Sequence, residues 1–165
     1  MTPSARSMSK PIATSISVTA ASPDRARAGA RSPLRIGGWA NLAIAAAHVV
    51  GLIWAWTMFT AVGIEHEMRE LAALGAGLPY LLTLMTAAVF VVFGLYALSG
   101  AGDLRRLPLL RTALVEVAAI YVSRATLFGG IDAVRDADAT QIGFAAIALM
   151  IGLCYAYGVT LVSRA

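Results

Sequence analysis

Four apolar runs, each long enough to cross a bilayer, constrain the fold of this chain more than any other feature. They lie at about residues 38–62, 78–98, 108–129 and 141–162. A helix of about 20 apolar residues spans the ~30 Å hydrocarbon core of a membrane. The connections between the runs are short and contain glycines, so consecutive helices are expected to pack antiparallel. The sequence therefore predicts an all-α fold, an integral membrane four-helix bundle.

The composition agrees with a membrane environment. Of the 165 residues, 59% are hydrophobic and only 13% are charged, and the mean hydropathy is +0.75. Soluble domains carry roughly 25% charged residues, so this chain lacks the polar side chains needed to cover a water-facing surface. Because the net charge of +4 arises mostly within the first 36 residues, it does not describe a nucleic-acid-binding face.

Residues 1–36 differ in character from the rest of the chain. They are rich in Ser, Ala, Pro and Arg, and Asp24 is their only acid. Such a segment cannot bury enough apolar surface to offset the entropy lost on ordering it. We therefore expect a disordered basic tail at 1–36, followed by a four-helix membrane domain at 37–165.

The distribution of lysine and arginine predicts the orientation of the bundle. One side of the membrane carries ten of these residues, in the tail, around the loop after the second run and at the C-terminus: Arg6, Lys10, Arg25, Arg27, Arg31, Arg35, Arg105, Arg106, Arg111 and Arg164. The opposite side carries Arg69 and Arg135. Since positive charge concentrates on the cytoplasmic side, both termini are expected to be cytoplasmic.

Small residues recur at every fourth position of the first and fourth runs. Helices in lipid associate through close packing of small residues, because lipid and leucine are equally apolar. The two sets are Ala43, Ala47 and Gly51 in the first run, and Ala148, Gly152 and Ala156 in the fourth. We expect these faces to contact each other or a second copy of the chain.

Polar side chains inside the runs are the candidates for function. His48 and Glu116 are expected at similar depths, roughly 15 and 13 Å from the cytoplasmic starts of their helices. They can pair if those helices touch, and Thr86 of the second run can join the same polar core. Arg124 lies within reach of the outer interface. Asn41 is expected to form a hydrogen bond near a helix end.

Two interpretations of Glu116 follow from its depth. An ionised group there costs at least ~2.5–3.5 kcal/mol, so a lone carboxyl is expected to keep its proton. It either releases that proton along an opening path beside His48, or forms a neutral hydrogen bond that fixes the helix register. For Arg124, extension to headgroups or to Asp132 is expected, with anion binding as the alternative.

Aromatic residues near the ends of the runs predict interfacial anchors, and Tyr155 is assigned to the inner interface on this basis. No nucleophile–base pair or set of metal ligands stands out in the sequence. Cys154 is the only cysteine, which excludes an intramolecular disulfide and CxxC redox chemistry. We therefore expect no enzyme activity, no metal and no cofactor.

The segment GLYALSGAGDLRRLPLLR, followed by IYVSRA, resembles a group of small four-helix inner-membrane proteins of proteobacteria without an assigned activity. The resemblance covers roughly residues 38–162 and implies a multi-pass protein of the bacterial inner membrane. Small multidrug exporters also have four helices and an intramembrane glutamate. Their glutamate lies in the first helix, where this chain has His48 and no acid, which argues against that family.

The expected function is association within the lipid bilayer without catalysis. The chain would act as a homo-oligomer or as an accessory protein of a larger membrane complex, with no nucleic-acid partner. The alternative is a small proton-coupled carrier or channel that uses Glu116 and His48.

Overall fold

The structure, a computed structural model, describes residues 23–127, 130–135 and 138–162. These residues form helices joined by short connections, with no strand among them, which confirms the predicted all-α class. In chain order the elements are α1 (Pro23–Gly51), the short 3-10 helix η1 (Leu52–Trp54), α2 (Ala55–Ala61), α3 (Glu65–Leu74), α4 (Leu78–Ala101), α5 (Leu110–Thr126), α6 (Gly130–Arg135) and α7 (Ala139–Val162).

Three helical stretches are long and apolar enough to cross a membrane: Ser32–Ala61, Leu78–Ala101 and Ala139–Thr160. They correspond to the first, second and fourth predicted spans. Helix α5, in the third predicted span, has 17 residues and extends about 25 Å at 1.5 Å per residue. Its sequence includes Arg111, Glu116 and Arg124. Three of the four predicted spans therefore meet the criteria of length and hydropathy.

The first helix begins earlier than the composition of the tail predicts. Helix α1 starts at Pro23, so the helix extends into the segment assigned to the tail; residues 1–22 lie outside the described part. Within this extension, Leu34 packs against another helix. Leu34 is 0% exposed, and its side chain occupies the space beside Gly158 of α7, where a Cβ would clash with it.

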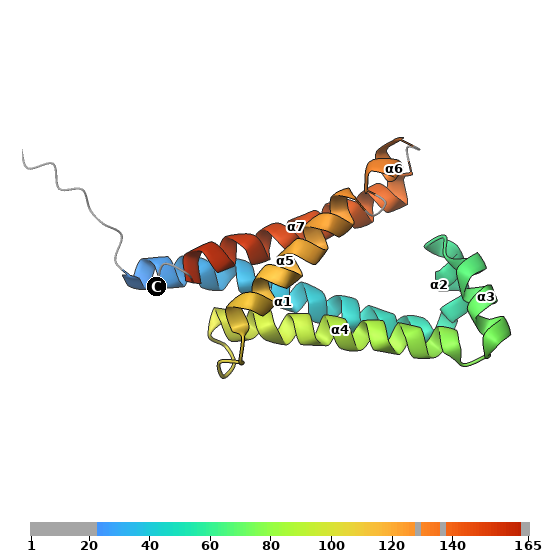
Figure 1. Cartoon of the computed structure of the whole chain (residues 1–165), viewed down its shortest axis with the longest axis horizontal. Coiled ribbons are helices and arrows are strands. Elements are labelled where there is room, and N and C mark those ends of the chain that lie inside the picture. Colours follow the sequence, from blue (N-terminus) through green and yellow to red (C-terminus); the bar gives the residue numbers. More distant parts are fainter. Residues whose placement is uncertain (1–22, 128–129, 136–137, 163–165) are drawn as a thin grey trace, which may run out of the picture.

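The helices form two antiparallel pairs that diverge like the arms of a V (Figure 1). Helix α1 packs along α4 in one arm, α5 packs along α7 in the other, and α1 also contacts α7. The arms meet near the connection between α4 and α5, and they separate toward α3 and α6 (Figure 1). The buried core lies at this junction and includes Leu34, Ala97, Leu114, Ile151 and Tyr155.

Polar contacts fix the connection between α4 and α5 at the junction. The buried Ser99 hydroxyl donates to the Arg105 carbonyl at 2.9 Å and accepts from the Leu107 N–H at 3.0 Å. Arg35 of α1 forms a two-pronged ion pair with Asp103 of the connection, with 2.6 Å between Nε and Oδ2. The first half of α1 is thereby joined to the turn that links the two arms.

Among the small residues of α7, Gly152 packs against α5. Ala148 is 7% exposed, Gly152 is buried and Ala156 is half-buried. A Cβ at Gly152 would lie 3.1 Å from both Tyr121 Cβ and Val122 Cγ2 of α5. The two helices can approach this closely because glycine has no side chain, as expected for helices that pack in lipid.

The small residues of α1 do not form the predicted contact with α7. Ala43 and Ala47 are exposed and Gly51 is half-buried. Helix α1 instead approaches α4 closely at Gly94, where an added Cβ would lie 2.9 Å from Leu42 Cγ. In this structure Ala43 and Ala47 therefore do not pack against the small face of α7, because the spacing identifies a face but not the neighbour that it meets. Contact of the α1 face with a second copy stays a prediction.

Candidate functional site

Asn41 is the centre of a buried hydrogen-bond network that joins the two arms. Its side chain is 0% exposed. Its Nδ2 donates to the Gly37 carbonyl at 2.9 Å and to Tyr155 Oη at 3.1 Å, while its Oδ1 accepts from Tyr121 Oη at 2.5 Å. Tyr155 Oη in turn donates to the Phe93 carbonyl at 2.8 Å. Four helices, α1, α4, α5 and α7, thus share one polar cluster.

This network departs from what the sequence predicts. Tyr155, expected at the interface as an anchor, is 0% exposed and lies in the core. Asn41 bonds across helices as well as to its own helix. The sequence does contain a signal for this network: the amide of Asn41 and the phenols of Tyr121 and Tyr155 lie in separate apolar runs. Since each buried polar group requires a partner, such groups are expected to bond to one another. All such atoms in the described residues have one.

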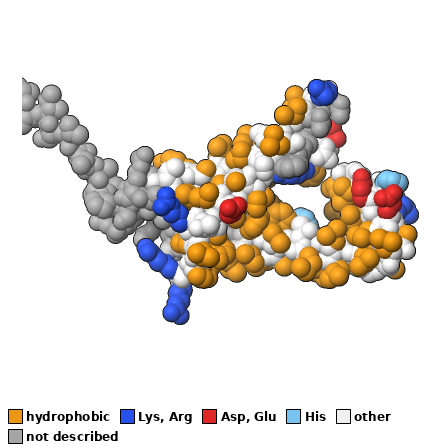
Figure 2. Space-filling view, viewed as in Figure 1, with side chains coloured by type: hydrophobic (Ala, Val, Ile, Leu, Met, Phe, Trp, Pro, Cys, Tyr) orange, Lys and Arg blue, Asp and Glu red, His pale blue; other side chains and the backbone are white. Residues whose placement is uncertain are grey.

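A cleft of about 880 Å³ separates the two arms beyond this network. Figure 2 shows the molecule hollowed between the arms, with hydrophobic side chains along the lower arm, which contains α1 and α4. Apolar side chains such as Ile44, Phe90, Phe144 and Ile151 line most of it. Polar residues also line it, among them His48, Thr83, Thr86, Arg124, Thr140 and Gln141. Of the candidates singled out from the sequence, His48, Thr86 and Arg124 therefore line one cleft.

Glu116 does not belong to this cleft. Its side chain is exposed on α5, on the side opposite the buried Leu114, Val117 and Tyr121. Within the described part of the chain no hydrogen bond or ion pair involves it. Glu116 and His48 therefore do not pair within the described part of this chain. Glu116 and His48 were expected at similar depths along their helices. Because α5 packs on α7, however, its Glu116 side chain faces outward, and the depth of a residue carries no information on the direction in which its side chain points.

His48 makes local contacts instead. Its Nδ1 lies 2.8 Å from the carbonyl oxygen of Ile44, one turn earlier in α1, and its ring lies 5.1 Å from that of Phe90 on α4. A carbonyl oxygen only accepts, so Nδ1 carries the hydrogen. In the neutral ring Nε2 then has a free lone pair and is a hydrogen-bond acceptor. His48 is among the residues that line the cleft.

Three other polar side chains of the cleft also donate hydrogen bonds to backbone carbonyls. Thr83 donates to the Pro79 carbonyl and Thr86 to the Leu82 carbonyl, each at 2.9 Å. Gln141 Nε2 of α7 donates to the Val62 carbonyl at 3.2 Å, which connects the two arms at the far end of the cleft. The oxygen lone pairs of these side chains remain available as acceptors. Asp132, the expected partner of Arg124, has a side chain outside the described residues.

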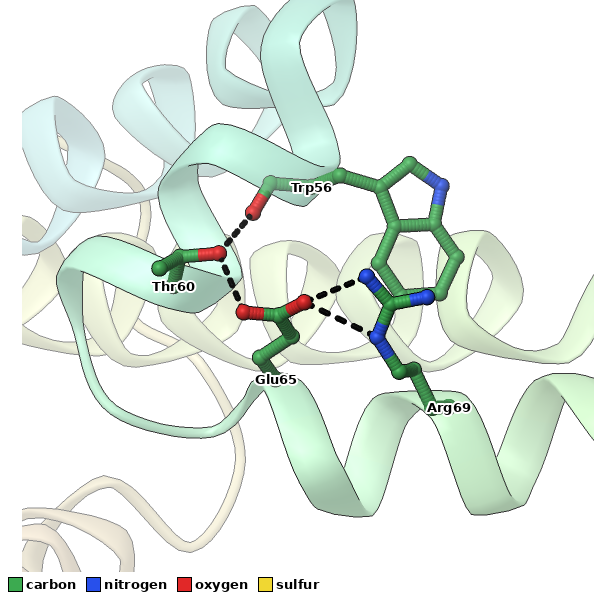
Figure 3. A network of polar contacts seen from close by, with 4 residues as sticks. All are labelled: Trp56, Thr60, Glu65 and Arg69. Atoms are coloured by element: carbon green, nitrogen blue, oxygen red, sulfur yellow. Dashed lines mark hydrogen bonds and ion pairs between the residues drawn. The ribbon is translucent and has the colours of Figure 1, made fainter.

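A second polar cluster holds α2 against α3 beside the cleft (Figure 3). Arg69 donates from Nε to Glu65 Oε1 at 2.8 Å, and its guanidinium lies 5.2 Å from the centre of the Trp56 ring. Thr60 Oγ1 lies 2.6 Å from Glu65 Oε2 and 3.0 Å from the Trp56 carbonyl. The hydrogen bond from Thr60, followed by that from Arg69, lowers the pKa of Glu65. Neighbouring residues of α2 line the cleft, so this cluster supports its wall.

Among the described residues, no group of three or more His, Cys, Asp or Glu side chains is arranged to hold a metal ion. His66 lies 3.3 Å from Glu70 on the exposed side of α3. Comparison of the chain with protein-family models, with curated proteins and with solved structures found no match.

Proposed function

We propose that this chain is a multi-pass protein of the bacterial inner membrane that acts without catalysis, by associating with a second copy of itself in the bilayer. In this proposal α5 also crosses the membrane, which makes four spans in all. Both termini are cytoplasmic, and the outward face of α5 is the contact surface. The exposed carboxylate of Glu116 is the observation that carries the proposal.

The outward face of α5 forms a seam of small and polar residues. Its members are spaced alternately by four and three positions: Thr112, Glu116, Ala119, Ser123 and Thr126. Ser123 is half-buried and the others are exposed. This alternation is the spacing with which two helices pack along a left-handed seam, and small side chains allow the close approach that membrane helices need.

The outward face of α4 has the opposite character. Leu81, Leu84, Met85 and Val92 are among its exposed residues, with Met85 58% exposed. Large apolar side chains are what hydrocarbon accommodates, whereas a carboxylate at depth costs at least ~2.5–3.5 kcal/mol unless it finds a partner. The seam of α5 is therefore better suited to another protein surface than to lipid.

A second copy is the partner that the seam fits. Copies threaded in the same direction are related by a twofold axis along the membrane normal, so identical residues meet at the same depth. Two Glu116 carboxyls can then share one proton, so that a single negative charge is spread over both groups in place of two adjacent charges. Ala119, one turn further along, leaves room for the backbones to approach.

Cysteine cross-linking in native membranes tests this proposal. In a Cys154→Ala background, Ala119→Cys is expected to give a disulfide-linked dimer on mild oxidation. Val92→Cys, on the exposed face of α4, is the matched control and should stay monomeric. Equal cross-linking at both positions, or cross-linking of Ala119→Cys only to a different protein, would contradict self-association through α5.

A further inference from the structure

The connection between α4 and α5 carries exposed arginines beside exposed leucines, and we infer that it binds the head groups of anionic phospholipids. This connection comprises residues 102–109, and Arg111 follows it in the first turn of α5. The inference requires the chain to lie in a bilayer. It requires neither the proposed pairing of two copies nor the proposed threading.

The connection lies where an apolar helix leaves the hydrocarbon. The stretch Leu78–Ala101 is long and apolar enough to cross a membrane, and the connection begins at the next residue. Its side chains are therefore expected at the level of the lipid phosphates. Figure 2 shows Lys and Arg side chains standing out from the molecule at the place that Figure 1 gives to this connection. Basic residues next to a span attract anionic lipids.

The positive charge of this segment is not balanced by the chain itself. Three exposed arginines lie here: Arg105, Arg106 and Arg111. In the part of the chain that the structure describes, their guanidinium groups form no hydrogen bond or ion pair. Asp103 is the only acid of the connection, and it is already ion-paired with Arg35. The three guanidinium groups therefore keep their donors for an external anion.

These groups select a phosphate whose charge the rest of the head group does not cancel. A planar guanidinium donates two parallel hydrogen bonds to phosphate oxygens. Phosphatidylglycerol presents such a phosphate beside uncharged hydroxyls, whereas phosphatidylcholine adds a trimethylammonium cation that arginines repel. The Ser99 side chain bonds to the Arg105 carbonyl and to the Leu107 N–H, so the backbone is already ordered. Binding therefore costs less conformational entropy.

Leu109 distinguishes a lipid from a soluble anion. Among the described residues it is the one non-glycine residue with a positive φ, at 53°, a conformation that strains a leucine. Its side chain is nevertheless 78% exposed, and that of Leu104 is 42% exposed. Packing within the described part of the chain therefore does not offset the strain. Both side chains can enter the hydrocarbon beside the head groups, a contact that inorganic phosphate cannot offer.

Native mass spectrometry of the full-length protein, released from a non-ionic detergent, tests the inference. The protein receives dioleoylphosphatidylglycerol or dioleoylphosphatidylcholine at equal concentrations, and the bound lipids are counted. We expect preferential retention of phosphatidylglycerol. Arg106→Gln should weaken that retention about fivefold, the effect of one basic residue near an anionic lipid surface. Arg135→Gln, which removes an exposed arginine of α6 and changes the net charge equally, is the matched control and should leave retention unchanged.

The variant Leu109→Asn separates the lipid contact from the backbone, because asparagine adopts a positive φ more readily than leucine does. It should fold and yet retain both lipids roughly tenfold less, as expected when one leucine side chain is taken out of hydrocarbon. If Arg106→Gln aggregates on size-exclusion chromatography, Arg111→Gln takes its place.

Equal retention of the two lipids by the wild-type protein would overturn the inference. So would unchanged retention in the arginine variant or in Leu109→Asn, or an equal loss in Arg135→Gln. Displacement of phosphatidylglycerol by inorganic phosphate at the same concentration would show a site for a soluble anion and would also overturn it. Dimer cross-linking through Ala119→Cys is measured in parallel. Preferential lipid retention without cross-linking would contradict the proposed self-association alone.

Discussion

Tyr121 donates a 2.5 Å hydrogen bond to the Oδ1 atom of Asn41, and this contact joins α5 to α1 across the junction of the two arms. Asn41 also donates to Tyr155 of α7. The two tyrosines therefore hold one amide from both sides, and Tyr121 is the only one of the two that donates to it. Removing the Tyr121 hydroxyl takes a donor away from Asn41, whereas removing the Tyr155 hydroxyl takes an acceptor away from it.

Tyr121→Phe should destabilise the protein because it leaves the buried Asn41 Oδ1 without a donor. The expected loss is about 1–2 kcal/mol, the range for an unsatisfied buried acceptor. The measurement is unfolding of the protein in mixed micelles by a denaturing detergent. Tyr157→Phe, at a position that is 55% exposed on α7, is the control and should change little. Equal stability of the two variants would contradict the role of the network.

Gly94→Ala should weaken the packing of α1 on α4. A Cβ at this position would lie 2.9 Å from Leu42 Cγ and 3.0 Å from the Gly38 carbonyl oxygen, so the helices must separate. Overpacking of this kind costs about 1–3 kcal/mol. Gly143→Ala on α7, where nothing lies within 4 Å of the added atom, is the matched control and should be neutral. The same unfolding assay measures both, and a neutral Gly94→Ala would show that α1 and α4 do not pack closely at this point.

The hydrogen bond from Thr60, with the contribution of Arg69, predicts a pH dependence at the turn between α2 and α3. Because these contacts lower the pKa of Glu65 in the folded protein, their stabilising effect is present above the ordinary pKa of a glutamate and is lost as the pH falls through the folded value. Thr60→Val should raise the pKa of Glu65, as measured by carbon-13 NMR titration of its carboxyl group. Thr57→Val, exposed on the same helix, should not. An unchanged titration in Thr60→Val would show that Thr60 does not donate to Glu65.

The sequence predicted the apolar runs well and the directions of single side chains poorly. Hydropathy and length identify the spans Leu78–Ala101 and Ala139–Thr160 within a few residues, since these are properties of a segment. The burial of Leu34 beside Gly158 was missed because the composition of the N-terminal segment carries no information on a contact with a distant helix.

Rotation about a helix axis explains the remaining differences at the candidate site. His48, Thr86 and Arg124 line the cleft, but Glu116 faces outward although it lies close to Arg124 in sequence. The polar partners of Asn41 are 80 and 114 residues away along the chain. Contacts at such separations follow from which helices pack together, which the pattern within one run does not specify.

The proposed threading predicts where reporter domains are active. If α5 crosses the membrane in addition to the three longer helical stretches, a fluorescent protein fused after Ala165 should fluoresce in the cytoplasm. Alkaline phosphatase inserted after Leu74, in the connection between α3 and α4, should be active on the outer side. If α5 does not cross the membrane, three spans place the C-terminus outside, and the C-terminal phosphatase fusion becomes active in place of the fluorescent one.

The measurement that tests the account most directly is the number of copies per particle in lipid, counted by single-molecule photobleaching at decreasing protein density. We predict two bleaching steps for the wild-type protein, with loss of pairs in Ala119→Leu, whose larger side chain blocks the seam of α5. Ala146→Leu, exposed on α7, should retain the pairs. Single steps for the wild type at every density, or pairs that survive Ala119→Leu as well as Ala146→Leu, would contradict association through the Glu116 face.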